Sequence, residues 1–282
     1  MLEMSDREKY LYDIQGYLVV KNFLTPEEVD RLNAAFDANR DKMTEDTNSN
    51  IGNSTTLKGH KRGLFTGMLE WEHPWCDPFR ELLIHPKAIP YLNTLHGRGW
   101  RMDHSPFALF STKGAEGLIL HGPGHNYFGL AAYHYKNGKM RTGMVVFQYQ
   151  LADVNEGDGG FCCIPGSHKA NYPCPRDIIE WESNQDLVYN VPCKKGDLLI
   201  FDEATTHGTL PWRADHERRS LLYRYSPHYL HYAGGYHKTS FPEWVNELTE
   251  AQRAVLEPPY HYNRPLIEDD CVTVIRPRDA GS

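Results

Sequence analysis

The stretch GDLLIFDEATTHG, residues 196–208, decides how this chain of 282 residues folds. Gly196 opens the stretch at a turn, and the apolar run over residues 198–201 is typical of a buried strand. His207 follows on a short polar return and precedes Gly208. A histidine at a strand edge beside a glycine can point into a cavity, although such a residue taken alone is more often structural than a ligand.

The next expected strand supplies groups that bind anions. Arg218 lies eleven residues after His207, and Ser220 follows two residues later. Because residues two apart in a strand share a face, Arg218 and Ser220 project to the same side. An arginine fork beside a hydroxyl is well suited to grip a carboxylate. The alternative is a surface arginine in a salt bridge, a role that Arg219 could equally fill.

A second histidine mirrors the first. Residues 118–120 form an apolar run that ends at His121, and Gly-Pro-Gly and His125 follow. His121 and His125 have the spacing of a helical zinc pair, but the glycines and the proline between them disfavour a helix. His121 therefore stands at a strand end, as His207 does. Two neutral imidazoles at one end of a barrel favour iron or another divalent metal.

Short apolar runs separated by turn residues fill the chain after residue 100. Several short strands at close spacing predict a sandwich or a barrel rather than a doubly wound sheet. The strands that we expect cover residues 100–111, 117–121, 142–151, 160–165, 187–191, 197–201 and 218–225.

Helices are expected on both sides of this barrel in the sequence. Thr25, Pro26 and Glu28 place an N-cap, a first-turn proline and a capping-box glutamate in order, and a second capping box begins at Thr249. We expect a single domain, built as follows: an N-terminal strand and helices over about 10–97, the barrel over about 100–226, and a C-terminal helical segment over about 240–260. Within the first part, we expect a strand over 14–21, a long loop over 40–63 and a helical region over 75–95.

The bulk composition argues against several functional classes. The formal net charge of -7 and the lack of a polybasic run disfavour a nucleic-acid partner. No apolar stretch is long enough to span a bilayer, and residues 1–10 lack a signal-peptide core. The 6 cysteines contain no CxxC pair, which disfavours a thiolate zinc site and suits reduced thiols. We therefore expect a cytoplasmic protein, a monomer or weak homo-oligomer, without membrane or nucleic-acid partners.

Three motifs together resemble one protein family. They are GYLVVKNFLTPEEVDRL (residues 16–32), GDGGFCCIPGSHK (residues 157–169), and GDLLIFDEATTHG with the later Arg218-Arg219-Ser220. In this order and spacing, the sequence resembles the phytanoyl-CoA dioxygenase family of iron(II)- and 2-oxoglutarate-dependent oxygenases. The resemblance implies a mainly β fold, a double-stranded β-helix of the jelly-roll or cupin-like type with flanking helices. It also implies iron(II), 2-oxoglutarate and molecular oxygen as cofactor and co-substrates.

The resemblance also implies roles for single residues. His121 matches the first iron ligand of the family, and His207 matches the distal ligand. Arg218 matches the arginine that binds the far carboxylate of 2-oxoglutarate. Thr209 and Ser220 match hydroxyl positions near that co-substrate.

One departure from the family pattern concerns the third iron ligand. Most members have His-x-Asp at the first ligand, but position 123 here is Pro123, which cannot ligate. The site could lack a protein carboxylate, could take a ligand from another strand, or could have lost iron. Gln148 and Gln150 share a strand face; Gln148 is a candidate ligand, and both could instead bind substrate or co-substrate. Further polar candidates on a strand are Asp103 and His104.

The activity that the resemblance implies is oxidation of a C–H bond, by default hydroxylation, in a small polar metabolite of secondary or specialised metabolism. If the iron shell lacks a carboxylate, oxidative cyclisation, desaturation or halogenation is the alternative. A catalytically silent relative that binds a ligand without turnover is the alternative from another class. Groups that could line the mouth of the site are His125, Tyr127, Tyr133, Tyr135 and the loop over residues 40–63.

Overall fold

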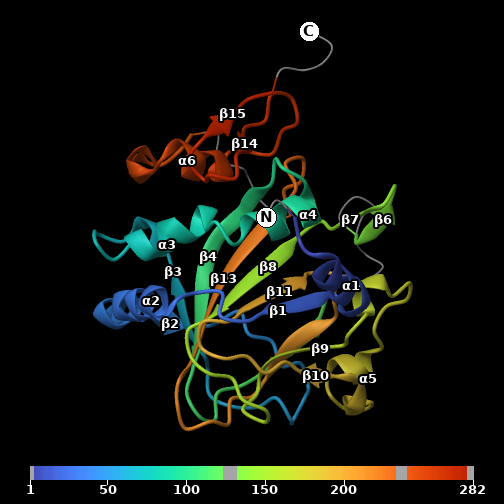
Figure 1. Cartoon of the computed structure of the whole chain (residues 1–282). Helices are drawn as coiled ribbons and strands as arrows, with labels where there is room; N and C mark the ends of the chain where they lie inside the picture. The colour runs from blue at the N-terminus through green and yellow to red at the C-terminus, as the bar shows by residue number, and fades with distance from the viewer. Residues whose placement is uncertain (1–2, 123–131, 233–239, 278–282) are drawn as a thin grey trace.

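The computed structural model describes residues 3–122, 132–232 and 240–277, and its architecture is mainly β (Figure 1). Two antiparallel sheets pack together as the predicted jelly-roll barrel. In spatial order, the larger sheet contains β1 (Tyr17–Val20), β11 (Leu198–Asp202), β8 (Val145–Gln150), β13 (Arg218–Ser226), β4 (Arg101–Ser111), β3 (Gly63–Thr66) and β2 (Thr44–Glu45). The smaller sheet contains β10 (Tyr189–Asn190), β9 (Gly160–Cys163), β12 (His207–Leu210) and β5 (Leu118–His121).

The central strands of the larger sheet alternate between two apolar layers. In β11, Leu198 and Ile200 join the large core beneath the helices, whereas Leu199 and Phe201 join the core between the sheets. β8 divides its side chains in the same way. Because both faces of these strands are covered, their sequences read as continuous apolar runs. Any polar side chain on the inner face therefore lies inside the barrel.

Helices pack against the outer face of the larger sheet (Figure 1). The predicted capping box begins α2 (Pro26–Ala38): the Glu28 N–H donates to the Thr25 hydroxyl at 3.2 Å, and the Thr25 N–H donates to the Glu28 carboxylate at 2.7 Å. The box at Thr249 likewise begins a helix. The helices α3 (Asp77–Glu81), α4 (Ile89–His96) and α6 (Glu250–Leu256) contribute to the same core, whereas α5 (Arg176–Ile179) packs beside the smaller sheet.

An aromatic cluster fixes α2 to the sheet. Phe36 is fully buried and lies 4.9 to 5.8 Å, between ring centroids, from four other aromatic rings. These rings come from β3, β4, α3 and the segment between β3 and α3; they are Phe65, Phe110, Phe79 and Trp71. Edge-on contacts of this kind add to the free energy gained by burying the ring.

The N-terminus differs from the prediction. Residues expected to begin a strand at position 14 belong instead to α1 (Asp6–Gln15), and the strand begins at Tyr17. Gly16, with a φ of 78°, ends the helix in the left-handed conformation that glycine adopts without strain. The helix was missed because Tyr12 is its only buried residue, so its sequence carries almost no apolar period.

Other local features also differ from the prediction. The strand expected over residues 187–191 shortens to the two residues of β10, and the long loop over 40–63 contains β2, which pairs with β3. Two hairpins were not predicted: β6 (His134–Lys136) with β7 (Lys139–Arg141), and β14 (Leu266–Ile267) with β15 (Val274–Ile275). Asn137 and Gly138 connect the first hairpin with φ of 54° and 76°, the conformation for which Asn-Gly turns are favoured.

The large core draws on distant parts of the chain. Its buried members run from Met4 to Cys271 and include residues of α1, the larger sheet and α6. Within the described residues, no helix combines the length and the apolar character needed to cross a membrane.

The aromatic cluster should dominate the stability of the outer layer. We expect Phe36→Ala to lower the free energy of unfolding by about 3–5 kcal/mol, the usual loss for a buried phenylalanine. Equilibrium urea denaturation measures this change. The control is Tyr172→Ala, because Tyr172 is 83% exposed and its loss should change stability by less than about 0.5 kcal/mol. Equal effects of the two variants would contradict the packing described.

Candidate metal and co-substrate site

A cavity of about 460 Å³ lies between the two sheets, inside the barrel. Its walls come from β4, β8, β11 and β13 of the larger sheet and from β5, β9 and β12 of the smaller one. The segment over residues 46–66 adds Asp46, Asn48 and Arg62. The long loop that the sequence placed at the mouth of the site therefore contributes polar side chains to this cavity.

His121 and His207 lie side by side on one wall of this cavity. The register of β12 against β5 pairs them directly, and their ring centroids lie 4.2 Å apart. The Nδ1 of His121 lies 3.1 Å from the Ile119 carbonyl oxygen, and that of His207 lies 2.6 Å from the Thr205 carbonyl oxygen. Since a carbonyl oxygen only accepts, each Nδ1 must carry the hydrogen, which leaves both Nε2 lone pairs for a metal.

Burial keeps His207 in the form that a metal needs. Desolvation, reinforced by the neighbouring His121 ring, lowers the pKa of His207 well below its usual value. The imidazole is therefore neutral at physiological pH, and a neutral imidazole is the form that ligates. His121 stays accessible to solvent at the same end of the barrel.

Glu203 is the residue that the sequence reasoning missed. One potential ligand atom from each of His121, Glu203 and His207 lies within 4.8 Å of the others. Glu203 is 9% exposed and lines the cavity. The signal that could have found it is a carboxylate four residues before His207, in a chain whose usual carboxylate position is Pro123. Pro123 itself lies outside the described residues.

The two glutamines have different surroundings. Gln148 is buried and lines the cavity, and its Nε2 has no hydrogen-bond partner among the described residues. Gln150 accepts a hydrogen bond of 3.2 Å from the Ser220 hydroxyl, and neither residue is among those that line the cavity. Thr209 lines the cavity on β12. Gln148 is thus the glutamine that is placed to meet a bound molecule.

Two buried arginines reach the cavity with unsatisfied donors. Arg218 is 2% exposed and Arg62 is 3% exposed, and the Nε and Nη1 atoms of each have no partner among the described residues. Arg62 is held by Asp46 through an Nη2–Oδ2 contact of 2.7 Å. Burial, with a smaller contribution from Arg62, lowers the pKa of Arg218 to about 9. A carboxylate could satisfy these unpaired guanidinium donors, because its two oxygens can accept two parallel hydrogen bonds.

Asp103 and His104 are joined in one chain of hydrogen bonds. The buried Asp103 accepts from the Ser226 hydroxyl at 3.0 Å, and its other oxygen accepts from His104 Nδ1 at 2.9 Å. His104 Nε2 then accepts from Arg224, whose guanidinium lies 4.5 Å from the Phe107 ring centroid. Asp103 therefore serves to fix His104 and Arg224, which both line the cavity.

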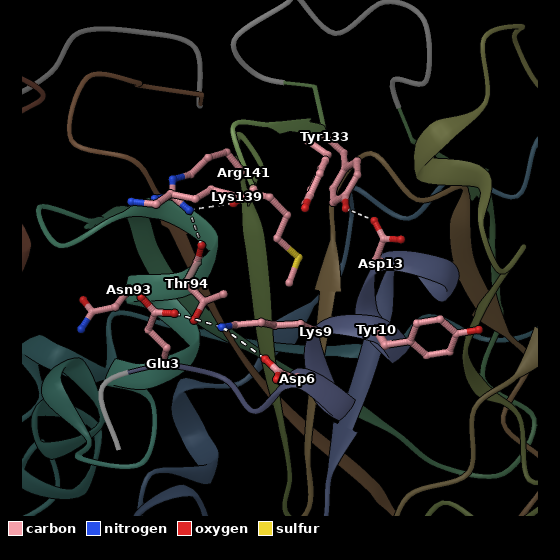
Figure 2. A pocket seen from close by; sticks show the side chains of 13 residues that line it. Glu3, Asp6, Lys9, Tyr10, Asp13, Asn93, Thr94, Tyr133, Lys139 and Arg141 are labelled. Carbon is pink, nitrogen blue, oxygen red and sulfur yellow. Dashed lines mark hydrogen bonds and ion pairs between the residues drawn. The ribbon is translucent and has the colours of Figure 1, made fainter.

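A second cavity, of about 660 Å³, lies between α1, α4 and the β6–β7 hairpin (Figure 2). Tyr133 and Tyr135, which the sequence suggested for the mouth of the site, line this cavity instead. Some of its polar groups pair with one another: the Tyr133 hydroxyl donates to Asp13, and Lys9 Nζ lies 2.9 Å from Glu3 Oε2. The other two candidates for the mouth, His125 and Tyr127, lie outside the described residues.

The jelly-roll fold and the polar cavity between its two sheets are those of a non-haem metal oxygenase. The match to the family model covers residues 12–220, so the chain belongs to the phytanoyl-CoA dioxygenase (PhyH) family. It is accordingly an iron(II)- and 2-oxoglutarate-dependent oxygenase that uses molecular oxygen. A search of curated proteins found no significant match.

Solved structures of similar fold include several metal- and 2-oxoglutarate-dependent proteins. HygX from Streptomyces hygroscopicus, with nickel and 2-oxoglutarate bound, is 22% identical over 79% of this chain and 87% of its own, with a TM-score of 0.64. The epimerase SnoN of nogalamycin biosynthesis is 19% identical over 79% and 82%, with a TM-score of 0.53. The carbocyclase SnoK of the same biosynthesis is 17% identical over 79% and 84%, with a TM-score of 0.55. At these identities the likeness establishes the shared fold.

Gly160 leaves room for the Arg218 side chain. A Cβ at Gly160 would lie 3.1 Å from Arg218 Nε, and the φ of Gly160 is 81°. We expect Gly160→Ala to displace the guanidinium and to raise the dissociation constant for 2-oxoglutarate about tenfold, a loss of about 1.4 kcal/mol. Isothermal titration calorimetry of the Mn(II)-loaded protein under nitrogen measures it.

Gly157→Ala is the matched control for this prediction. Gly157 has a similar φ of 84°, but an added Cβ would meet nothing within 4 Å. It therefore carries the same backbone strain without the contact to Arg218. A loss of 2-oxoglutarate affinity in both variants would assign the effect to the backbone and refute the contact.

Proposed function

We propose that this protein oxidises a C–H bond of a small polar metabolite in specialised metabolism, with hydroxylation as the default outcome. In this proposal His121 and His207 ligate iron(II), and Arg218 binds the far carboxylate of 2-oxoglutarate. The observation that carries the proposal is one cavity that combines two imidazoles and a buried arginine, whose Nε2 atoms and guanidinium donors, respectively, have no partner among the described residues. The residues present thus suit both the metal and the dicarboxylate.

The residues of the chain prepare the site for this chemistry. Iron(II), when bound, supplies oxygen activation coupled to the decarboxylation of 2-oxoglutarate to succinate. The Thr205 and Ile119 carbonyls hold the two imidazoles in the ligating tautomer. Arg218 and Arg62 would attract and orient the dicarboxylate, and the Gln148 amide would donate to an oxygen atom of the bound co-substrate. The apolar walls formed by Val146, Phe161 and Leu222 exclude water.

Two features support a small polar substrate. The cavity mouth carries polar groups that can orient such a molecule, including Asn48, His104 and Arg224. One HygX structure holds hygromycin B together with nickel and 2-oxoglutarate, so a protein of the same fold accepts a small molecule in addition to the metal and the co-substrate. Arg224 adds a positive charge that would favour a substrate with an acidic group.

Cyclisation or another oxidative outcome remains the second candidate. The epimerase SnoN and the carbocyclase SnoK have the same fold, which supports outcomes other than hydroxylation on this scaffold. The residues that decide between them are those that place the target carbon, and only product analysis distinguishes the outcomes.

We also propose that the chain forms a single domain, that it is cytoplasmic, and that it is a monomer or associates weakly. The six free cysteines suit a cytoplasmic location.

The metal assignment is tested by anaerobic titration. We expect iron(II) and 2-oxoglutarate together to give the wild-type protein a weak visible charge-transfer band, and succinate to form once air and a substrate are admitted. His207→Ala should abolish the band, because it removes one of the two imidazoles. His60→Ala, which removes an exposed histidine outside the cavity, is the control. A wild-type protein that shows neither the band nor succinate would refute the proposed function.

The role of Arg218 is tested against its neighbour Arg219. Arg219 projects to the other side of β13 and pairs with Glu217 and Asp37, both at 2.8 Å. We expect Arg218→Gln to raise the KM for 2-oxoglutarate by about 10–100-fold, since hydrogen bonds to charged groups contribute about 1.5–3 kcal/mol. Arg219→Gln should leave that KM near the wild-type value. Steady-state kinetics with varied 2-oxoglutarate measures both, and equal effects would overturn the assignment.

A further inference from the structure

We propose that Glu203 is the third protein ligand of the metal and replaces the carboxylate that most family members carry two residues after the first histidine. The proposal rests on the proposed function, because it assumes that His121 and His207 hold iron(II). It differs from the family pattern in where the carboxylate comes from: the turn between β11 and β12 instead of the segment after β5.

The strand before this turn directs Glu203 into the barrel. Phe201 and Glu203 are two residues apart and both line the cavity, as expected for one face of an extended chain. The Glu203 N–H donates to the Met144 carbonyl at 3.1 Å, which continues the pairing of β11 with β8 beyond Asp202. The backbone thus fixes the direction of the carboxylate before any metal binds.

The turn from Asp202 to His207 is held by several hydrogen bonds. Asp202 closes its start: its carboxylate accepts from the Ala204 N–H and its carbonyl from the Thr205 N–H, both at 2.9 Å. The Thr205 hydroxyl donates to the Gly16 carbonyl at 3.1 Å, and the Thr206 N–H donates to the Ser167 hydroxyl at 2.8 Å. Glu203 and His207 are therefore held on one rigid turn, as a preorganised ligand pair requires.

The groups around Glu203 are suited to binding a cation. Its carboxylate forms no hydrogen bond or ion pair with the described residues, although the residue is 9% exposed. The carboxylate lines the cavity and has no protein partner there, so its charge is available to a divalent metal. Among the described residues, one ligand atom from each of the two imidazoles lies within 4.8 Å of a Glu203 carboxylate oxygen. Two imidazoles and one carboxylate form the donor set typical of non-haem iron(II), with positions left open for oxygen and 2-oxoglutarate.

If Glu203 is the third ligand, two consequences follow, one for the role of Gln148 and one for the type of reaction. With a carboxylate in place, the neutral Gln148 amide is free to hydrogen-bond the co-substrate instead of the metal. A protein carboxylate bound to iron would leave no place for a halide ligand. The arrangement therefore favours hydroxylation, cyclisation or desaturation over halogenation.

The experiment is an anaerobic calorimetric titration of the protein with iron(II) alone, without 2-oxoglutarate or turnover. We expect Glu203→Ala and Glu203→Gln to weaken iron(II) binding at least about tenfold, a loss of at least about 1.4 kcal/mol. Added formate should restore much of the affinity of Glu203→Ala, because the shortened side chain leaves space for a small carboxylate. Formate should not rescue Glu203→Gln, which keeps the side-chain volume. Circular dichroism and thermal unfolding establish that each variant is folded.

Two matched controls come from the same cavity. Asp46→Asn removes a cavity carboxylate that pairs with Arg62, and Gln148→Ala removes the rival oxygen donor. Both should keep the wild-type iron(II) affinity. Wild-type affinity in both Glu203 variants, with loss in His207→Ala, would overturn the role of Glu203 and leave the proposed function intact. Loss in Gln148→Ala alone would assign the third position to Gln148. No binding by the wild-type protein would overturn the proposed function itself.

Discussion

The pairing of β12 between β5 and β9 is the constraint on which the site depends. It sets His207 opposite His121 and places both at one end of the barrel. Because side chains alternate along a strand, a shift of one residue in this register would turn His207 out of the cavity. Gly208 permits the close approach, since a Cβ there would lie 2.7 Å from the Leu118 carbonyl oxygen. Backbone hydrogen bonds of the smaller sheet therefore determine the spacing of the two imidazoles.

The two layers of the barrel divide stability from function. The outer layer, between the larger sheet and the helices, is an apolar core of aromatic and aliphatic side chains. The inner layer accepts polar groups that ordinary packing would exclude: Arg62, Gln148 and Arg218 keep buried donors that no described residue satisfies. Each such donor is unfavourable in an empty barrel, and a charged ligand reverses the sign of that contribution. The stable outer layer allows the inner one to remain unsatisfied until a ligand binds.

With Glu203 as the proposed ligand, the same donor set arises from a different part of the chain. In most of the family, a histidine and a carboxylate share the short segment after one strand. In this chain, the turn from Asp202 to His207 carries both, and His121 comes alone from β5. The metal responds to the positions and charges of the donor atoms, whatever their order in the sequence. A substitution at one strand end can thus be compensated at the facing strand end, because β5 and β12 are neighbours in the sheet.

The sequence by itself predicted the class of fold and the helix starts at Thr25 and Thr249, because capping boxes, apolar runs and strand ends depend on residues close together in the chain. Through the family resemblance it also singled out His121, His207 and Arg218, which the structure places around one cavity. Only the tertiary structure decided which carboxylate faces the two histidines, that Arg62 joins Arg218 in the cavity, and that Tyr133 and Tyr135 lie in a different cavity. Those relations depend on strand register and on how the loop before β3 folds back over the barrel. Neither is recorded in the spacing of residues along the chain, because both arise from the packing of segments distant in the sequence.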